Sequence, residues 1–433
     1  MIKLYHHQEI ALSFMRMQKS FALFMEGGTG KTLVVLTRIL ELFKQDKIKN
    51  ALIVCPKAVI GAWERDMEIL GNPLEFEQVT VINYDMIWRR EQYNKHWDVI
   101  ILDESHFIKR HARKRSKFIL GLALNSTYRY IMTGTAVGNG KLEDVWSQFA
   151  FLFPVKALRS IASKHFGTYY EFSNKHCVLN KYYQPYKYLH IDEIQTVLNT
   201  FSYHVTKEEC LDLPEKLPDE IYDIELQEKA MYKKLVKDKA IADLDLVVEN
   251  PAHLMTVLRE ICSGFCVNNG DKSELKCEKI RTLDEFLEGH DKKLVIFAHF
   301  KYSILQIEQL MTKKKIKFVT LDGRTKDKNI WRDFQKNDKI QVIICQYQTA
   351  SQGIDLFSAD TIIYYEPTLS STLLEQSKDR IYRIGQTKKC RYIHFITKGT
   401  LERNIYISLQ KHIDFNQNLF IEVMEDYQKG FGF

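Results

Sequence analysis

The string EGGTGKT, at positions 26–32, lies between the apolar run FALFM and the helical pattern LVVLTRILELF. A strand, a glycine-rich turn and a helix in that order form a phosphate-binding loop, because glycines let backbone N–H groups approach phosphate oxygens. In such a loop Gly28, Thr29 and Gly30 would surround the phosphates. Lys31 would offer its ammonium to the β and γ phosphates, and Thr32 would bind magnesium through its hydroxyl. The string therefore predicts a site for ATP and Mg2+.

Two carboxylates follow the apolar run WDVIIL, in the string DESH. The polar ends of parallel strands gather around ligands, so both carboxylates would face the nucleotide. Asp103 would hold Mg2+, largely through water, whereas Glu104 would orient and deprotonate the attacking water. His106 has two interpretations. It couples the nucleotide state to Thr133 and Thr135 of the string TGT through a hydrogen bond, or it is an ordinary structural histidine.

Arginines recur in the string QSKDRIYRIGQ, which follows the apolar run TIIYYE. Arg380 and Arg383 are three residues apart, so on a helix both guanidinium groups would project from one face toward a shared target. Such arginines stabilise the charge that develops on a transferred phosphoryl group, and they accelerate its transfer by about 10³ to 10⁵. Arginine pairs are common on surfaces, but the first half of this chain already supplies the loop, the metal ligand and the base. We therefore expect Lys31, Glu104, Arg380 and Arg383 to be catalytic.

Short apolar runs, typical of buried parallel strands, occur in two sets. The first set is FALFM, ALIVC, VTVI, DVIIL and RYIMT, and the second is KLVIFA, KFVTL, QVIIC, TIIYY and YIHFI. Their alternation with helical patterns indicates an α/β fold with parallel sheets. Between the two sets the strand signal fades and helical patterns replace it. The sequence thus predicts an amino-terminal ATP-binding lobe at 1–155, a helical insert and lead-in at 156–290, and a second lobe at 291–433.

The chain has 433 residues and a formal net charge of +7, which favours a polyanionic partner without requiring one. Its eight cysteines are scattered and fit neither a disulfide framework nor a paired zinc site. The sequence contains no apolar run of about 18 residues and no apolar signal core, so neither membrane spanning nor secretion is supported. We expect the protein to work inside a cell, in the cytoplasm or nucleoid of a prokaryote or in the host cell of a virus.

Together these strings resemble superfamily two helicases, and most closely the SWI/SNF-type ATPases, which are DNA translocases that include chromatin remodellers. The likeness covers almost the whole chain and continues in family order through LYHHQ, CPKAVIGAWERD, LDESHFIK, TGTAVGN, LEDVWSQFAFLFP, DLPEK, LMTVLREIC, LDGRT, SQGIDL and the closing RIGQ. Two positions depart from the family pattern. Met25 replaces the first glycine of the longer phosphate-loop pattern, and Ala136 replaces a proline.

The resemblance implies two RecA-like lobes that hold ATP between them, grip one strand of a duplex and step along it. It also implies roles for residues whose chemistry alone is ambiguous. Gln8 would read the adenine, and Gly353 and Asp355 would take part in nucleotide binding. Gln376 would take part in coupling ATP hydrolysis to movement.

The resemblance further implies nucleic-acid contacts for Lys57, Arg324 and Ser351, where small residues and exposed N–H groups grip a phosphate backbone without reading bases. Two other segments have open interpretations. The basic run KRHARKRSK at 109–117 either contacts phosphates or forms a solvated helix face. The tyrosine-rich segment 169–188 either stacks on bases or, as we favour, packs as a half-buried hairpin.

We therefore expect a magnesium-dependent ATPase that is stimulated by double-stranded DNA and tracks along it as its lobes alternately close and open. One alternative is a strand-separating helicase that acts on DNA or RNA. Another is a scaffold that binds ATP and nucleic acid but barely hydrolyses ATP, although the intact catalytic residues argue against it. We expect the protein to be a monomer that does not bind membranes. Besides nucleic acid, we expect a targeting protein as a partner.

Overall fold

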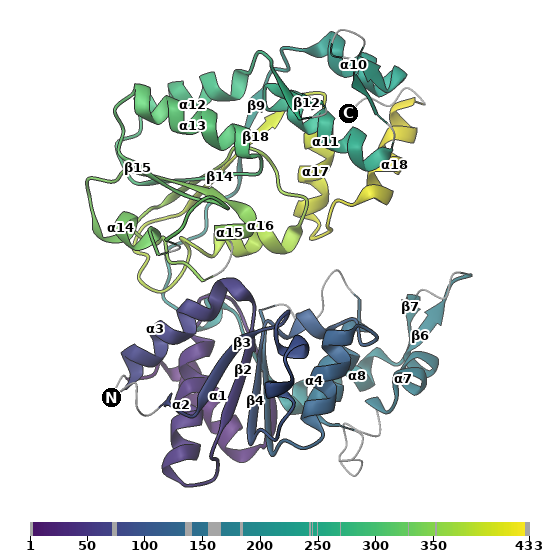
Figure 1. Ribbon diagram of the computed structural model, residues 1–433, viewed down its shortest axis with the longest axis vertical. Coiled ribbons are helices and arrows are strands. Elements are labelled where there is room, and N and C mark those ends of the chain that lie inside the picture. Colours follow the sequence, from purple (N-terminus) through teal and green to yellow (C-terminus); the bar gives the residue numbers. More distant parts are fainter. Residues whose placement is uncertain are drawn as a thin grey trace. The chain divides into compact units, whose positions relative to one another are not determined.

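The computed structural model describes residues 3–71, 76–134, 141–154, 166–181, 185–241, 244, 246–248, 250–268, 270–327, 329–350 and 353–428. The chain divides into two compact units, unit 1 (Met1–Asp212) and unit 2 (Leu213–Phe433). Each unit contains its own six-stranded parallel sheet with helices on both faces (Figure 1). The two parallel α/β lobes predicted from the sequence are therefore confirmed.

The sheet of unit 1 has the strand order β3-β2-β4-β5-β1-β8, and every neighbouring pair is parallel. Its strands are β1 (Ser20–Met25), β2 (Ala51–Cys55), β3 (Val79–Asn83), β4 (Val99–Asp103), β5 (Tyr128–Met132) and β8 (Ser202–Val205). The first five coincide with the predicted apolar runs. The sixth strand, β8, comes from the segment that was assigned to the helical insert.

Helices cover both faces of this sheet, as Figure 1 shows. One face packs against α1 (His6–Met17), α2 (Lys31–Lys44) and α3 (Ile60–Leu70), and the other against α4 (Lys114–Ala123), α5 (Asp144–Leu152), α7 (Tyr169–His176) and α8 (Ile191–Phe201). Successive residues of β4 alternate between the two cores, because strand side chains point to opposite faces. Burial on both faces explains why these strands are continuously apolar.

The other elements in the described part of unit 1 are short. They are the 3-10 helices η1 (Lys57–Val59), η3 (Ile87–Arg89), η4 (Glu91–Tyr93) and η5 (Ser105–Ile108), the helix α9 (Lys207–Cys210), and the antiparallel hairpin of β6 (Cys177–Leu179) and β7 (Pro185–Tyr188). The described part of the tyrosine-rich segment thus forms α7 and this hairpin. Tyr169 stacks on His111 with ring centroids 3.9 Å apart, whereas Tyr170 and Tyr186 are exposed.

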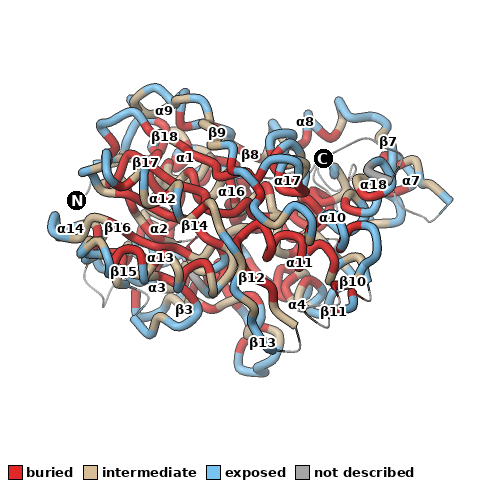
Figure 2. Tube along the Cα trace, turned by 90° about the horizontal axis from the view of Figure 1, so that it is seen from above, coloured by how far each residue is buried: buried red, intermediate tan, exposed pale blue. Residues whose placement is uncertain are grey.

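The sheet of unit 2 has the strand order β15-β16-β14-β17-β18-β9, again entirely parallel. Its strands are β9 (Glu220–Ile224), β14 (Leu294–Ala298), β15 (Phe318–Leu321), β16 (Val342–Gln346), β17 (Thr361–Tyr364) and β18 (Arg391–Thr397). Figure 2 shows β14, β16 and β17 as buried. All strands but β9 coincide with predicted runs.

Helices also cover both faces of the second sheet. One face packs against α12 (Glu278–Glu288) and α13 (Lys301–Lys313), and the other against α10 (Lys229–Asp238), α11 (Pro251–Cys262), α14 (Trp331–Lys336), α15 (Tyr347–Ala350), α16 (Ser371–Lys378), α17 (Leu401–Gln410) and α18 (Gln417–Gln428). Two small hairpins complete the unit, β10 (Ala240–Ile241) with β11 (Leu246–Val247) and β12 (Phe265–Asn268) with β13 (Asp271–Glu274).

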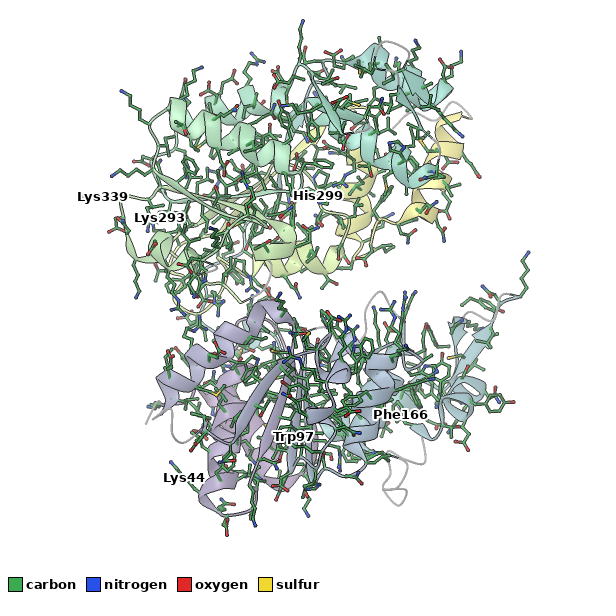
Figure 3. All side chains as sticks on the ribbon, viewed as in Figure 1. Lys44, Trp97, Phe166, Lys293, His299 and Lys339 are labelled. Atoms are coloured by element: carbon green, nitrogen blue, oxygen red, sulfur yellow. The ribbon has the colours of Figure 1, made fainter. Side chains whose placement is uncertain are left out.

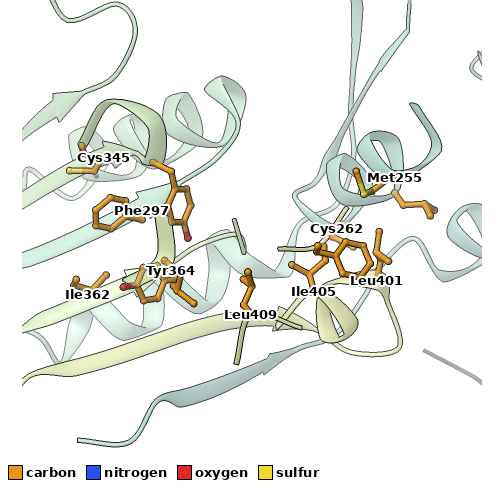
Figure 4. Close-up of a cluster of buried hydrophobic side chains, with 14 of the residues drawn as sticks. Met255, Cys262, Phe297, Cys345, Ile362, Tyr364, Leu401, Ile405 and Leu409 are labelled. Carbon is orange, nitrogen blue, oxygen red and sulfur yellow. The ribbon is translucent and has the colours of Figure 1, made fainter. Parts of the chain in front are cut away.

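The larger core of unit 2 joins its sheet to its helices. Figure 4 shows Phe297 and Tyr364 of the sheet in the same cluster as Cys262 of α11 and Leu409 of α17. The segment 156–290 is therefore divided between the two units: β8 completes the first sheet, whereas β9, α11 and α12 belong to the second unit. None of the described helices has the length and apolar composition needed to cross a lipid bilayer.

Candidate active site

The phosphate-binding loop of unit 1 connects the carboxyl end of β1 to the first residue of α2. Gly28 and Gly30 have φ values of 82° and 83°, which glycine adopts readily and other residues rarely do. A Cβ atom on Gly30 would lie only 2.1 Å from Nε2 of Gln8. The loop therefore needs glycine at this position both for its backbone and for the space that Gln8 occupies.

Gln8 lies in α1 and is 1% exposed. Its Nε2 donates a hydrogen bond to the carbonyl oxygen of Thr29 at 3.0 Å, and its Oε1 accepts one from the backbone N–H of Tyr5 at 2.9 Å. The ring of His7 contacts the same carbonyl oxygen at 2.9 Å. The residue expected to read the adenine thus also fixes the shape of the phosphate loop.

Lys31 and its neighbours close the loop. Lys31 is 9% exposed, and its Nζ donates to the carbonyl oxygens of Met25 at 2.7 Å and Glu26 at 3.2 Å. The hydroxyl of Thr29 donates to the Glu26 carbonyl at 2.8 Å, while Thr32 is partly exposed in the first turn of α2. The ammonium therefore lies directly against the loop, where an entering phosphate would replace backbone carbonyls as its partner.

A contact from the far end of unit 1 anchors the start of this loop. The carboxylate of Glu26 accepts a hydrogen bond from the backbone N–H of Lys207 at 2.8 Å, and the backbone N–H of Glu26 donates to the Val205 carbonyl at 3.0 Å. Lys207 is fully buried. Sequence reasoning missed this anchor, because no motif in residues 205–207 indicates a contact with Glu26, which lies about 180 residues earlier in the chain.

Asp103 ends β4 and is 7% exposed. Its Oδ2 accepts a hydrogen bond from the indole N–H of Trp63 at 2.9 Å, and its carbonyl oxygen accepts one from the Tyr84 hydroxyl at 2.8 Å. Burial, together with the neighbouring charge of Glu104, raises the pKa of Asp103. Trp63 belongs to the string CPKAVIGAWERD and could have been suspected from it, whereas the role of Tyr84 had no signal in the sequence.

The structure brings together Glu104, His106 and Thr133. The Thr133 hydroxyl donates to Oε2 of Glu104 at 3.1 Å, and Nδ1 of His106 lies 3.2 Å from that hydroxyl and 3.3 Å from the same carboxylate. Burial opposes ionisation of Glu104, but His106, with Lys31 and Thr133, outweighs it and lowers the pKa of the carboxyl. Glu104 is thus a carboxylate held between two polar side chains. Thr135 lies outside the described residues.

The strand end that carries Thr133 also reaches the phosphate loop. A Cβ atom on Gly134 would lie 3.5 Å from the backbone nitrogen of Gly27. A side chain at this position would thus come into ordinary van der Waals contact with the loop, so the two backbones lie close together.

The arginines of unit 2 converge, but the expectation that they project from one face of a helix is wrong. Helix α16 ends at Lys378, and both arginines lie in the turns that follow it. Nη1 of Arg380 and Nη1 of Arg383 each donate to the carbonyl oxygen of Ile354 at 3.2 Å. Beyond the helix, the Arg380 carbonyl accepts from the backbone N–H of Leu356 at 2.8 Å, a tertiary contact that residue spacing does not reveal.

Gln386, the last residue of the string RIGQ, holds this turn in place. Its Nε2 donates to the carbonyl oxygens of Phe357, Ala359 and Ile381 at 3.3, 2.9 and 3.1 Å. The preceding Gly385 has a φ of 98°, and a Cβ atom there would lie 3.1 Å from the ring of Phe357. The glycine and glutamine of this string are therefore positioning residues for the arginines, a function that sequence reasoning did not assign to them.

The other nucleotide-associated residues of unit 2 surround the same loop. Gly353 has a φ of 73°, and the carboxylate of Asp355 forms an ion pair with Arg383. The carbonyl of Gln376 accepts from Nε of Arg380 at 2.7 Å. The side-chain Oε1 of Gln376 is buried and has no hydrogen-bond partner within the described part of the chain.

The predicted nucleic-acid residues have different environments. Lys57 is exposed and follows the carboxyl end of β2. Arg324 forms ion pairs with Asp322 at 2.7 Å and Glu308 at 2.9 Å, so a phosphate would have to compete with two carboxylates. Ser351 lies outside the described residues.

Two family models match this chain. The SNF2-related domain matches residues 7–79 and 72–265, and the helicase conserved C-terminal domain matches residues 278–385. The chain belongs to the SNF2-related family. The first match contains Lys31, Glu104 and Thr133, and the second contains Arg380 and Arg383.

Individual relatives are identical to this chain at about a quarter of the aligned positions. It is 24% identical over 443 residues to the SWI/SNF-related matrix-associated actin-dependent regulator of chromatin subfamily A-like protein 1 of Xenopus laevis, covering 93% of this chain and 43% of that protein. It is 23% identical over 435 residues to a putative ATP-dependent helicase/translocase of Bacillus subtilis, covering 90% and 45%. The chain thus spans less than half the length of these curated relatives.

Among solved structures, the chain is similar to the Sulfolobus solfataricus SWI2/SNF2 ATPase core in complex with dsDNA. The match has 25% sequence identity and a TM-score of 0.45, and it covers 99% of this chain and 94% of that chain.

Proposed function

We propose that this chain hydrolyses ATP in the presence of Mg2+ and uses that hydrolysis to move along double-stranded DNA. The observation that carries the proposal is the arrangement of Glu104, His106 and Thr133 next to Asp103, at the same sheet edge as Lys31. A partly buried carboxylate that is held by two polar side chains beside a phosphate-binding loop is the arrangement that water activation requires.

The residues of unit 1 divide the chemical work. Backbone N–H groups of the loop and the Lys31 ammonium bind the phosphates, and Glu104 accepts the proton of the attacking water. Its pKa is lowered, chiefly by His106, so Glu104 is ionised at neutral pH and its oxygens are free to accept a hydrogen bond from the attacking water. The Thr133 hydroxyl keeps the carboxylate oriented, since it donates directly to the oxygen Oε2.

The donors near the loop fit magnesium, which prefers oxygen ligands. Asp103 offers a carboxylate, and Thr32 offers a hydroxyl in the first turn of α2. When bound there, Mg2+ would neutralise phosphate charge and orient the terminal phosphoryl group for transfer.

Unit 2 would contribute the arginine that stabilises charge on the transferred phosphoryl group. Arg383 is the better candidate of the two, because its guanidinium is partly exposed and is paired with Asp355, a carboxylate that a phosphate could replace. Arg380 is only 9% exposed and donates to the carbonyls of Gln376 and Ile354, so it mainly supports the turn. The proposal requires Arg383 to reach the phosphates held by unit 1 during the reaction.

DNA as the partner rests on charge and on relatives. The net charge of +7 suits a polyanion, and Lys57 is exposed at a sheet edge where ligands gather. A relative from Mus musculus, 24% identical over 421 residues, is named a DNA annealing helicase and endonuclease. None of the described positions suggests base reading, so we propose contact with the backbone rather than with a particular sequence.

The direct test is ATP turnover at low salt without nucleic acid and with duplex DNA, single-stranded DNA or RNA. We expect the largest stimulation with duplex DNA, and we expect Glu104→Gln to abolish turnover while ATP still binds. A wild-type protein that no nucleic acid stimulates would overturn the proposal. Displacement of a third strand from a DNA triplex, with the duplex left paired, would distinguish translocation from strand separation.

A further inference from the structure

Six cationic side chains gather at the amino-terminal end of α4, and none of them takes part in the ATP site. We call them the α4 basic surface: Arg89, Arg90, Arg110, Arg113, Lys114 and Lys117. All six are exposed. They come from two segments that meet at Trp88, whose ring centroid lies 5.2 Å from the guanidinium carbon of Arg89 and 6.0 Å from Nζ of Lys114.

The backbone beneath the α4 basic surface is held by Arg115. Nη1 of Arg115 lies 3.1 Å from Oδ1 of Asp85, and its Nη2 donates to the carbonyl oxygen of Phe107 at 3.0 Å. The guanidinium also lies over the rings of Tyr84 and Phe107, at 5.6 and 5.5 Å. The two cationic segments are therefore tied to each other by a partly buried arginine and two aromatic rings.

Carboxylates do not neutralise this surface. Asp85 is already paired with Arg115, and Asp144 lies 3.5 Å from Lys109, which precedes the six. Within the portion of the chain that the structure describes, none of the six cations forms an ion pair. The first turn of α4 also lacks an acidic residue, although the positive end of the helix dipole favours one. An external anion would relieve both the mutual repulsion and the mismatch with the dipole.

The chemistry of this surface favours phosphate over a protein partner. No large apolar side chain is exposed among the described residues between 76 and 117, so the surface has no apolar centre of the kind that protein interfaces use. Lysine and arginine without such a centre are typical of sites that neutralise a nucleic-acid backbone.

The sheet topology connects this surface to Lys57. In the order β3-β2-β4, Lys57 follows β2, the segment with Arg89 and Arg90 follows β3, and the segment with Arg110 and Arg113 follows β4. All three segments leave the sheet at the carboxyl ends of its strands, which lie on the same side because the strands run in one direction. A duplex in contact with Lys57 would therefore pass along the same edge.

We propose that the α4 basic surface is a second contact for the phosphate backbone of duplex DNA, and this inference rests on the proposed function. It binds without regard to base sequence and keeps unit 1 attached to the duplex. Neither the phosphate loop nor the arginines of unit 2 supply this contact.

The test compares two triple variants of the full chain that lose the same charge. One is Arg110→Gln, Arg113→Gln and Lys114→Gln. The control is Lys44→Gln, Lys47→Gln and Lys49→Gln, at exposed positions where α2 leads into β2, on the opposite edge of the sheet (Figure 3 labels Lys44). The dissociation constant for duplex DNA is measured by fluorescence anisotropy at several salt concentrations, and circular dichroism verifies folding.

We expect the first variant, but not the control, to lose salt dependence and affinity. The slope of log K against log salt should fall in magnitude by about 0.9 for each lost contact, which corresponds to about eightfold weaker binding per contact at 0.1 M salt. The single variant Lys117→Gln should show the loss of one contact, and it replaces the triple variant in the test if the triple variant does not fold.

Three results would overturn the inference, and only the first of them would also overturn the proposed function. Wild-type protein that binds no DNA would defeat the proposed function as well. Equal slopes of log K against log salt for the two triple variants would overturn only the second DNA contact and would leave the proposed function intact. Unchanged DNA binding combined with lost binding of a poly-glutamate probe would show that the surface takes an acidic protein instead.

Discussion

The Thr133 hydroxyl contacts both the candidate base Glu104 and the ring of His106. Thr133→Val removes this hydroxyl and nearly preserves the side-chain shape. We expect kcat for ATP to fall about tenfold or more while KM changes little, because a hydrogen bond to a charged group contributes about 1.5–3 kcal/mol. Steady-state kinetics would measure both constants. The exposed Thr127→Val is the control, and a wild-type kcat for Thr133→Val would show that Glu104 does not need this donor.

His299, labelled in Figure 3, makes unit 2 sensitive to acid. Burial and the neighbouring charge of Arg259 lower the pKa of its imidazole from 6.5 to about 3. Below pH 6.5 the unfolded chain therefore binds a proton that the folded unit does not, and the free energy of unfolding falls with decreasing pH. The change is at most about 1.4 kcal/mol per pH unit until the pH approaches 3. We expect His299→Asn to reduce this dependence.

Urea unfolding between pH 7 and pH 5 would measure this effect. Trp331 is the only one of the five tryptophans that lies in unit 2, so its signal in fluorotryptophan-labelled protein reports that unit. The exposed His412→Asn serves as the control. An identical pH dependence in wild type and His299→Asn would contradict the assignment.

At the scale of elements, the turn after α16 depends on Gln386, whose Nε2 donates to three carbonyl oxygens. Gln386→Glu replaces that donor with an acceptor and should displace Arg383. We expect DNA-stimulated ATP turnover to fall by about tenfold or more, since even a 1 Å misplacement of a catalytic group is costly. The affinity for ATP should change little, because unit 1 holds the phosphate loop.

Kinetic and binding measurements on Gln386→Glu would be compared with Gln309→Glu, an exposed position on α13 that undergoes the same change. Equal loss of turnover in the two variants would mean that charge, rather than the position of the arginine, is responsible.

A buried ion pair joins α12 to α17. Nζ of Lys279 lies 2.6 Å from Oε1 of Glu402, and both side chains are 0% exposed. Lys279→Met leaves an unpaired buried carboxylate and should lower the free energy of unfolding by about 3–5 kcal/mol. The added substitution Glu402→Gln should restore much of that loss, because an amide can still accept from the backbone N–H of Thr397. Denaturant unfolding of the three variants would measure both effects, and a double variant no more stable than Lys279→Met would refute this explanation.

The strands that the sequence predicted and those that it missed differ in how continuously apolar they are. Ten strands were predicted from apolar runs, which in β4 and β14 are buried on both faces. The edge strands β8 and β9 were missed because polar residues interrupt SYHV and EIYDI, whereas the edge strands β3 and β15 are also only partly buried but were found from their apolar runs. Local patterns also identified the glycine loop and the two carboxylates. The turn after α16 and its support from Gln386 depend on contacts with the 354–359 loop, which spacing along the chain does not encode.

At the scale of the whole molecule, the groups required for phosphoryl transfer are divided between two separately folded units. Unit 1 contains the loop lysine, the carboxylates and Thr133, and unit 2 contains the converging arginines. Each unit has its own sheet and its own pair of cores. We therefore expect the loss of one catalytic group in unit 2 to disable hydrolysis of a nucleotide that unit 1 still binds.

Single-turnover ATP hydrolysis by Arg383→Ala, with saturating duplex DNA, tests that claim most directly. The control is Arg403→Ala, at an exposed arginine of α17 in the same unit. We expect a rate about 10³-fold or more below wild type for Arg383→Ala, with little change in the dissociation constant for ATP. Hydrolysis by Arg383→Ala at the wild-type rate would contradict it.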